Sequence, residues 1–218
     1  AVHNRYLHSV GAMHLAGRAF DSVFGGADWL SSEQKARFRQ IVRLAGLLHD
    51  IGHAPLSHAA ESLMPMRETM GLEEYGVTTG QASHEEMGLK LLVASPLTER
   101  LNTAFADMEI TAQHVAAVLG TFTSNIESDF VVEGIDHRPV LHSMVSGELD
   151  IDRMDYLLRD SYFTGVSYGR YDLTWLLSNL TIFVDSEEKA RLAFGMKALP
   201  AFEHFLLARY HMFQMVYF

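Results

Sequence analysis

The sequence predicts a mostly α-helical chain with one small β-hairpin near residues 180–194. Apolar residues recur with the spacing of amphipathic helices over most of the 218 residues. The exception comprises two β-prone runs, 180–184 and 190–194, which are separated by an acidic turn at 185–189. No internal repeat and no shift in composition divides the chain, so we expect a single domain.

The first two helices are predicted over residues 8–24 and 31–50. The first carries a wide apolar stripe that closes at Gly25 and Gly26, as is typical of a helix C-terminus. The second opens on Ser31-Ser32-Glu33, which has the residue types of a helix start. We expect this helix to stop at Gly52.

Shorter helices follow along the chain. Pro55 suits the first turn of a helix over 55–63, because its fixed φ fits the first helical position. The glycine-bearing stretch 68–81 is weakly patterned and predicts a loop or flap. Further helices are expected over 83–93, 97–106, 112–119, 139–145, 152–160, 172–177 and 199–218.

Composition excludes several classes of protein. The 17 Lys and Arg against 27 Asp and Glu give a net charge of −10, so no basic surface is available for non-specific nucleic-acid binding. The absence of cysteine excludes disulfides, thiolate metal sites and cysteine catalysis. No apolar run approaches the ~20 residues of a membrane span, and no signal peptide is visible. We therefore expect a cytoplasmic protein without a membrane partner, truncated at both ends because it lacks an initiator Met and stops in mid-pattern.

Histidine and carboxylate residues carry the chemical signal. The chain has 12 histidines and no cysteine, and imidazole with carboxylate is a ligand set of hydrolytic metal centres. The sharpest pattern is His-Asp-Ile-Gly-His-Ala-Pro-Leu-Ser-His at 49–58. We place His49 and Asp50 in the last turn of the preceding apolar helix, where the helix dipole favours a cation. A bare His-Asp is usually a surface pair, but here it follows a run of buried character, where unpartnered polar groups are costly.

Two further segments offer partners for this pair. His8 lies at the start of the first predicted helix, a place where a histidine is more often a cap or a core residue. In the segment 150–160, Asp150 is interpreted as an N-cap. The apolar stripe of that segment comprises Ile151, Met154, Leu157 and Leu158. One polar face comprises Asp152, Tyr156, Arg159 and Asp160, for which the alternative interpretation is an exposed face with ion pairs.

Together these strings resemble the HD-domain metal-dependent phosphohydrolases. The similarity is greatest to the deoxynucleoside triphosphate triphosphohydrolases, the group of bacterial dGTPases and the vertebrate SAM-and-HD-domain dNTPase. It rests on Arg-Tyr-Leu-His-Ser at 5–9, the string at 49–58, His-Glu-Glu at 84–86 and Asp-Ile-Asp-Arg-Met-Asp-Tyr-Leu-Leu-Arg-Asp at 150–160. The resemblance implies one helical HD phosphohydrolase domain over residues 1–218.

The resemblance also implies roles for individual residues. One divalent ion, either Mn²⁺, Fe²⁺, Mg²⁺ or Zn²⁺, would be held by His8, His49, Asp50 and Asp152. The implied catalytic residues are His84, His53 and Glu61, with Glu61 orienting a catalytic histidine and His53 facing the phosphates. The implied substrate-binding residues are Arg5, His58, Arg153, Tyr156, Asp160, Arg209 and Tyr217.

The implied reaction is hydrolysis of a dNTP to a 2′-deoxynucleoside and inorganic triphosphate. The implied partners are the dNTP substrate, an allosteric nucleotide and further copies of the chain in a homo-oligomer. Two alternatives stay open. One is another HD phosphohydrolase, acting on a nucleoside monophosphate, a cyclic nucleotide or guanosine tetraphosphate. The other is a nucleotide-sensing module without turnover. Histidines outside the motifs, such as His3 and His114, are expected to be core or surface residues.

Overall fold

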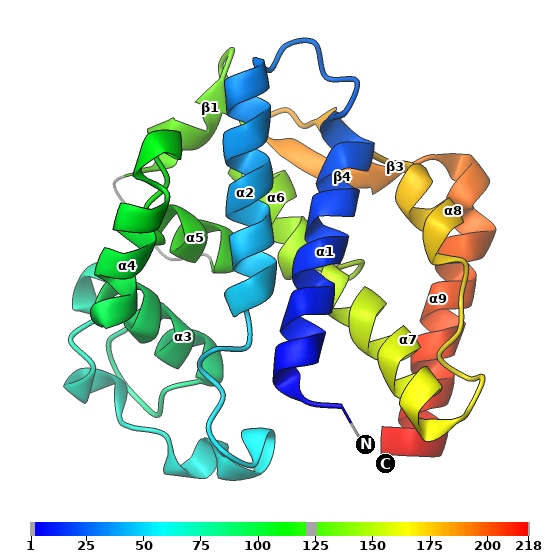
Figure 1. Ribbon diagram of the computed structural model, residues 1–218, viewed down its shortest axis with the longest axis horizontal. Coiled ribbons are helices and arrows are strands. Elements are labelled where there is room, and N and C mark those ends of the chain that lie inside the picture. The colour runs from blue at the N-terminus through cyan, green and yellow to red at the C-terminus, as the bar shows by residue number, and fades with distance from the viewer. Residues whose placement is uncertain (1–2, 121–125, 218) are drawn as a thin grey trace.

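Helices dominate the structure, a computed structural model that describes residues 3–120 and 126–217 (Figure 1). The α-helices are α1 (Arg5–Phe24), α2 (Ser32–Leu48), α3 (His84–Val93), α4 (Pro96–Ala104), α5 (Ala112–Leu119), α6 (Arg138–Val145), α7 (Ile151–Thr164), α8 (Leu173–Ser178) and α9 (Leu199–Met212). The strands are β1 (Val131–Val132), β2 (Ile135–Asp136), β3 (Leu180–Val184) and β4 (Ala190–Phe194). This architecture confirms the predicted fold class.

The predicted β-hairpin is confirmed with the predicted strand limits. Strands β3 and β4 are antiparallel, with Leu180 opposite Phe194 and Val184 opposite Ala190. Asp185 closes the turn, because its Oδ1 accepts hydrogen bonds from the backbone N–H groups of Glu187 and Lys189 at 2.9 and 3.0 Å. The second hairpin, β1–β2, was not predicted, since strands of two residues are too short to show alternation.

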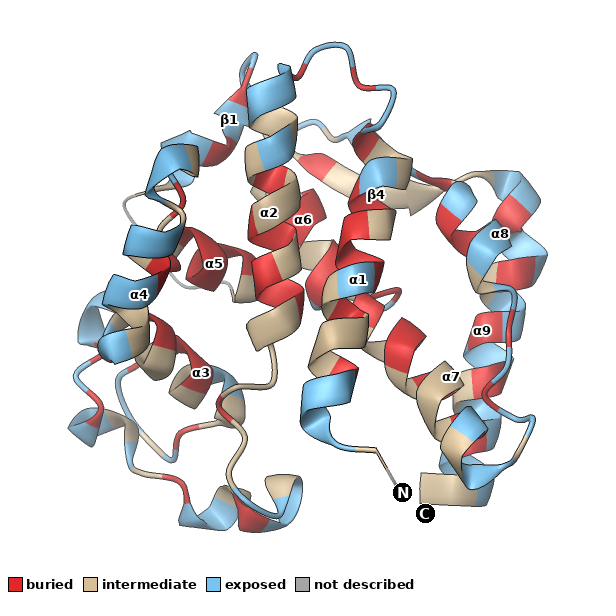
Figure 2. Ribbon diagram, in the orientation of Figure 1, coloured by how far each residue is buried: buried red, intermediate tan, exposed pale blue. Residues whose placement is uncertain are grey.

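Helices α1 and α2 pack side by side in the middle of the molecule, with α7 against α1 (Figure 1). Figure 2 shows buried residues concentrated along α1, α2, α5 and α6, whereas the segment between α2 and α3 alternates between exposed, intermediate and buried residues. Gly46 permits the close approach of three helices. A Cβ at this position would lie 2.8 Å from Ile151 Cδ1 of α7 and 3.1 Å from the Ala12 carbonyl oxygen of α1. The absence of a side chain there lets the functional ends of α1, α2 and α7 converge.

The limits of the first two helices differ from the predicted ones. Helix α1 begins at Arg5 rather than at residue 8, because the Asn4 side chain accepts a hydrogen bond from Leu7 N at 3.1 Å and caps the helix. Helix α2 starts as predicted, after a capping box between Ser31 and Gln34. It ends at Leu48, so His49 and Asp50 directly follow the helix instead of lying in its last turn.

Three other boundaries are corrected. The predicted helix at 55–63 is a 3₁₀ segment over Ser57–Leu63, because Leu56 and Ser57 adopt left-handed φ angles of 70° and 52° that stop Pro55 from opening a helix. The loop at 68–81 contains two short 3₁₀ turns, Arg67–Thr69 and Glu73–Tyr75. The last helix is α-helical to Met212 and continues as a π-helical turn over Phe213–Tyr217, while its predicted end at residue 218 lies outside the described residues.

Helix α7 runs to Thr164, beyond the predicted end at residue 160, and stops where Gly165 adopts φ 76°. In the described part of the chain, no helix combines the length and the apolar character that a membrane crossing demands.

Candidate active site

Four side chains from three distant segments meet near the N-terminal end of α1 and the C-terminal end of α2. His8 comes from α1, His49 and Asp50 follow α2, and Asp152 lies in the first turn of α7. The Nε2 atoms of His8 and His49 are 3.2 Å apart, and Asp152 Oδ1 lies 3.0 Å from the first and 3.5 Å from the second. Asp50 Oδ1 lies 3.4 Å from His49 Nε2. We call these four residues the His–Asp centre.

The hydrogen bonds behind the two imidazoles orient them toward each other. His49 Nδ1–H donates to the Gly46 carbonyl oxygen at 2.9 Å, and a carbonyl oxygen can only accept. His8 Nδ1–H donates to Asp155 Oδ2 at 2.8 Å. In the neutral rings both Nε2 lone pairs therefore face each other, an arrangement that needs a cation between them. Two imidazole nitrogens with two carboxylates fit a divalent ion in both charge and donor type.

The pKa values of His8 and Asp152 also indicate that the centre favours a bound positive charge. Burial alone lowers the pKa of His8, but hydrogen bonds to Asp152 and Asp155 outweigh it and raise the pKa to about 9. Burial alone raises the pKa of Asp152, but His49 and His8 hold it well below its usual range. A proton is thus retained in the metal-free centre at neutral pH, and a divalent ion would replace it.

Asp155 is a residue that the sequence reasoning missed. Its carboxylate is buried and accepts hydrogen bonds from His8 and from the Arg159 guanidinium, whose Nε and Nη2 lie 2.7 and 2.9 Å away. Arg159, expected on the polar face of Asp152, contacts Asp155 instead. The available signal was a third carboxylate in the 150–160 string, one helical turn beyond Asp152.

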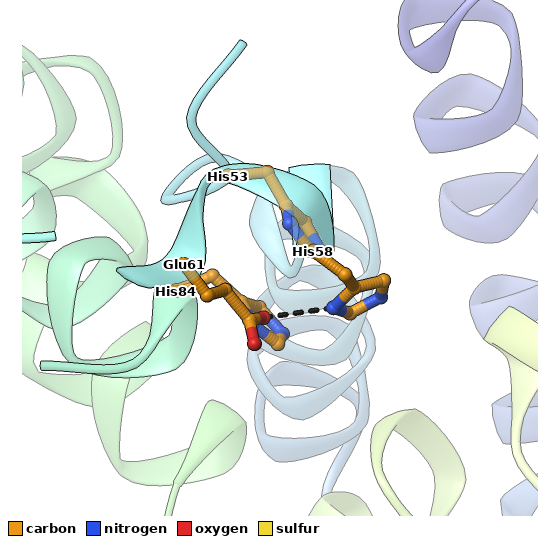
Figure 3. A group of neighbouring side chains, drawn as sticks. All are labelled: His53, His58, Glu61 and His84. Atoms are coloured by element: carbon orange, nitrogen blue, oxygen red, sulfur yellow. Dashed lines mark hydrogen bonds and ion pairs between the residues drawn. The ribbon is translucent and has the colours of Figure 1, made fainter. Parts of the chain in front are cut away.

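A second group of polar side chains lies beside the His–Asp centre. We call His53, His58, Glu61 and His84 the histidine cluster (Figure 3). His58 and His84 donate from Nδ1 to Glu61 Oε1 at 2.7 and 3.1 Å. The rings of His53 and His84 are stacked, with centroids 3.9 Å apart and planes 10° apart. The cluster adjoins the His–Asp centre, because His53 Nε2 is 3.5 Å from Asp50 Oδ1.

Local structure explains how the histidine cluster forms. Ser83 caps α3 in a capping box with Glu86, which places His84 at the first helical position. Gly52 lets the loop after α2 touch this helix, since a Cβ there would lie 1.9 Å from the His84 carbonyl oxygen. Gly52 was predicted as the stop of the preceding helix. Its structural role is instead this close approach, which brings the ring of His53 onto that of His84.

A cavity of about 800 Å³ joins the two groups. Its volume lies within the range of small-molecule sites. The described residues that line it include most of those expected at the site, namely Arg5, His8, His49, Asp50, His53, His58, His84, Asp152, Arg153, Tyr156, Asp160 and Tyr217. Two expected residues do not line it. Glu61 bonds to His58 and His84, and Arg209 Nη1 lies 3.6 Å from Glu148 Oε2.

One end of the cavity is built around Asp160. The Tyr217 hydroxyl donates to Asp160 Oδ2 at 2.7 Å, and His3 Nε2 lies 2.6 Å from Asp160 Oδ1. Tyr156 also lines this end, with its ring centroid 6.1 Å from that of Tyr217. His3, expected to be an ordinary core or surface residue, thus lines the cavity.

The two arginines of the cavity are held by the chain itself. Arg5 contacts the Asp50 carboxylate and the Ser57 hydroxyl. Arg153 contacts the Gly147 carbonyl oxygen and the carboxylate of Asp150. Asp150 is the predicted N-cap of α7 and accepts from Arg153 N at 2.8 Å, and burial raises its pKa to about 6. The guanidinium groups therefore already have fixed positions on the cavity wall.

These features define a helical protein with a candidate divalent-metal centre on the wall of a cavity of about 800 Å³. Comparison with known proteins agrees with that class. The sequence pattern of the HD domain family matches residues 5–160, which is more than half of the chain. The chain belongs to the HD domain family of phosphohydrolases.

Several relatives share this similarity. An uncharacterized protein of Mycoplasma pneumoniae is 34% identical over 99% of this chain and 44% of its own length. The deoxynucleoside triphosphate triphosphohydrolase SAMHD1 homolog of Dictyostelium discoideum is 32% identical over 77% of this chain and 28% of its own length. The crystal structure of a phosphohydrolase from Bacteroides thetaiotaomicron is 30% identical with a TM-score of 0.66, over 99% of this chain and 42% of that one. The chain therefore spans less than half the length of these relatives.

Proposed function

We propose that this chain hydrolyses 2′-deoxynucleoside 5′-triphosphates to the deoxynucleoside and inorganic triphosphate. The proposal rests on one arrangement: the His–Asp centre, the three histidines of the histidine cluster and two arginines line a single cavity of about 800 Å³. The similarity to the SAMHD1 homolog of Dictyostelium discoideum supports the same substrate class. The domain extent over 1–218, the cytoplasmic location, the homo-oligomer and the allosteric nucleotide stay predictions.

His8, His49, Asp50 and Asp152 would hold one divalent ion, for which Mn²⁺, Fe²⁺, Mg²⁺ and Zn²⁺ are candidates. When bound, such an ion polarises a phosphoryl oxygen and makes a water molecule nucleophilic at neutral pH. The two carboxylates of the centre offset the charge of the ion. Asp155 and the Gly46 carbonyl oxygen keep the two imidazoles in the tautomer that presents Nε2 to it.

Arg5, Arg153 and His58 would bind the triphosphate. A chain with a net charge of −10 repels a polyanion, so local guanidinium groups must supply the attraction. Arg5 and Arg153 line the cavity, where their guanidinium groups would contact the phosphates. Arg209 would reach the phosphates by leaving Glu148. That carboxylate is 84% exposed, and an exposed ion pair of this kind is weak.

His84 would donate a proton to the sugar oxygen that leaves the α-phosphorus. Glu61 accepts the hydrogen bond from His84 Nδ1, which fixes the orientation of the ring. The stacked ring of His53 fixes the plane of the same imidazole. A histidine side chain positioned in this way can act as the general acid for the departing sugar oxygen.

The sugar would occupy the end of the cavity around Asp160. The carboxylate of Asp160 would accept a hydrogen bond from a sugar hydroxyl, in place of one of its present donors, Tyr217 and His3. The Tyr156 ring would lie against the sugar and leave no room for a 2′-hydroxyl. The proposal therefore includes selection of deoxyribonucleotides over ribonucleotides.

Product analysis tests the proposal. The chain is incubated with each dNTP and with ATP in Mg²⁺, Mn²⁺ or Fe²⁺, and the products are separated by anion-exchange chromatography. Inorganic triphosphate with an equal amount of deoxynucleoside is the expected result. Release of orthophosphate, or turnover of a monophosphate, a cyclic nucleotide or guanosine tetraphosphate instead, would indicate another HD phosphohydrolase. Binding without turnover would indicate a sensing module.

A further inference from the structure

The histidine cluster has the composition of a metal site of its own. Each of its four side chains offers one nitrogen or oxygen atom, and these atoms all lie within 4.8 Å of one another. Figure 3 shows Glu61 in hydrogen-bond contact with His58 and close to the ring of His84. Three imidazoles with one carboxylate form a donor set typical of zinc. None of the four residues belongs to the His–Asp centre.

Two of the donor separations in the cluster are near those that a tetrahedral ion requires, and the others lie within 4.8 Å. Zinc binds nitrogen and oxygen at about 2.0–2.2 Å, which puts neighbouring donors roughly 3.4 Å apart. His84 Nδ1 and Glu61 Oε1, at 3.1 Å, already approach this separation. His58 Nδ1 is 2.7 Å from Glu61 Oε1, and its side chain is 73% exposed, so it is free to move outward.

His53 has a nitrogen without a partner. Its side chain is 5% exposed, and its Nδ1 is buried without a hydrogen-bond partner among the described residues. A buried polar atom of this kind costs free energy unless it gains a partner. The ring stacks on that of His84 in nearly parallel planes, and the lone pair of an imidazole nitrogen lies in the plane of its ring. One of the two rings must therefore turn for both nitrogens to face a common ion, and the exposed His58 and Glu61 side chains must adjust around it.

The two sites differ in charge. The His–Asp centre has two carboxylates and offsets the charge of a divalent ion, whereas the histidine cluster has one carboxylate and leaves a net positive charge. We therefore expect the centre to fill first. Mg²⁺ prefers oxygen donors and retains its waters, so three imidazoles are poor ligands for it. Zinc is the cation that the cluster fits.

We propose that the histidine cluster binds a second divalent cation of the zinc type when no nucleotide occupies the cavity, and that this cation inhibits hydrolysis. The inhibitory half rests on the proposed function, because it follows from the engagement of the proton donor His84 and the phosphate contact His58. The binding half rests on the geometry of the cluster alone.

Zinc titration tests the binding half. The metal-stripped chain is dialysed against increasing ZnCl₂, and the bound zinc per chain is counted by mass spectrometry. Two zinc ions are expected in the wild type, one for each group of ligands. The double variant His58→Ala, Glu61→Gln is expected to lose one ion. Asp152→Asn, the matched control in the other site, is expected to lose the other. Thermal melting by circular dichroism checks that each variant folds. If the double variant does not fold, the single variant His58→Ala replaces it, because the His58 side chain is exposed.

Several outcomes would overturn the inference. A single zinc ion per wild-type chain, or two ions retained in the double variant, contradicts the second site. Triphosphate release with Mn²⁺ is measured on the same wild-type samples as zinc is added. A rate that stays unchanged after the second zinc ion binds contradicts inhibition. If the wild type releases no triphosphate with any metal, the proposed function fails while the zinc count still decides the binding half.

Discussion

Asp155 accepts a hydrogen bond from His8 Nδ1 at 2.8 Å, although 147 residues separate them in the sequence. The Arg159 fork holds the other side of the same carboxylate. Asp155 therefore sets which nitrogen of His8 faces the His–Asp centre. Partners of this kind behind a metal-binding histidine are worth about 10–100-fold in metal affinity.

We expect Asp155→Asn to weaken metal binding by about 10–100-fold while the helical fold is kept. The amide matches the carboxylate in size but can donate from its NH₂ group to Nδ1, which would place the ring proton on Nε2 and remove the lone pair that faces the centre. Titration with Mn²⁺ under equilibrium dialysis measures the affinity. Asp107→Asn, an exposed carboxylate, is the control. Equal affinities in the two variants would show that Asp155 does not position His8.

Asp152→Asn is expected to lose both the bound metal and the activity. The Asp152 carboxylate lies within 3.5 Å of both imidazole Nε2 atoms, and its replacement by an amide removes one negative charge from the site. Metal content after gel filtration and triphosphate release are measured on the same sample. Full metal occupancy with a normal rate would show that the ligand assignment is wrong.

The sequence predicted much of the architecture because the responsible signals are local. The stripe of α2 and the turn of the β3–β4 hairpin each lie within a few residues. The predictions for the start of α1 and for the segment Ser57–Leu63 were wrong for equally local reasons. These are the Asn4 cap and the left-handed φ of Leu56. Neither conformation is indicated by hydrophobic periodicity.

The candidate site was predictable to the extent that motifs name it. His8, His49, Asp50 and Asp152 were expected together, and the structure brings them together, while their binding of metal stays a prediction. The contact of His3 with Asp160 spans 157 residues and depends on how the segment before α1 packs against α7. No local pattern encodes a contact of that kind, so His3 was not expected at the cavity.

His84→Ala is expected to keep its metal but to lose on the order of 10²–10⁴-fold in rate, the usual cost of removing a general acid or base. The imidazole lies in the histidine cluster, outside the His–Asp centre, so Mn²⁺ binding should not change. Single-turnover triphosphate release and Mn²⁺ affinity together separate the two effects. An unchanged rate would assign the proton transfer to His53 or to solvent.

The stability of the metal-free chain should fall as pH rises from about 6.5 to about 9. The folded-state pKa of His8 is raised from 6.5 to about 9, so the folded chain binds this proton more tightly than the unfolded chain. The stabilisation is fully present below pH 6.5 and is lost as pH rises through 9, by up to roughly 3 kcal/mol. Asp150, with a pKa of about 6, titrates below this window. Urea unfolding in a chelator measures the trend, and His8→Gln should reduce it. The part that remains belongs to His49, whose pKa is also raised, against the effect of burial, by Asp152 and Asp50. Saturating Mn²⁺ should remove the trend in the wild type, because the ion displaces the proton. A flat profile in the metal-free wild type would mean that no proton is held between His8 and the carboxylates.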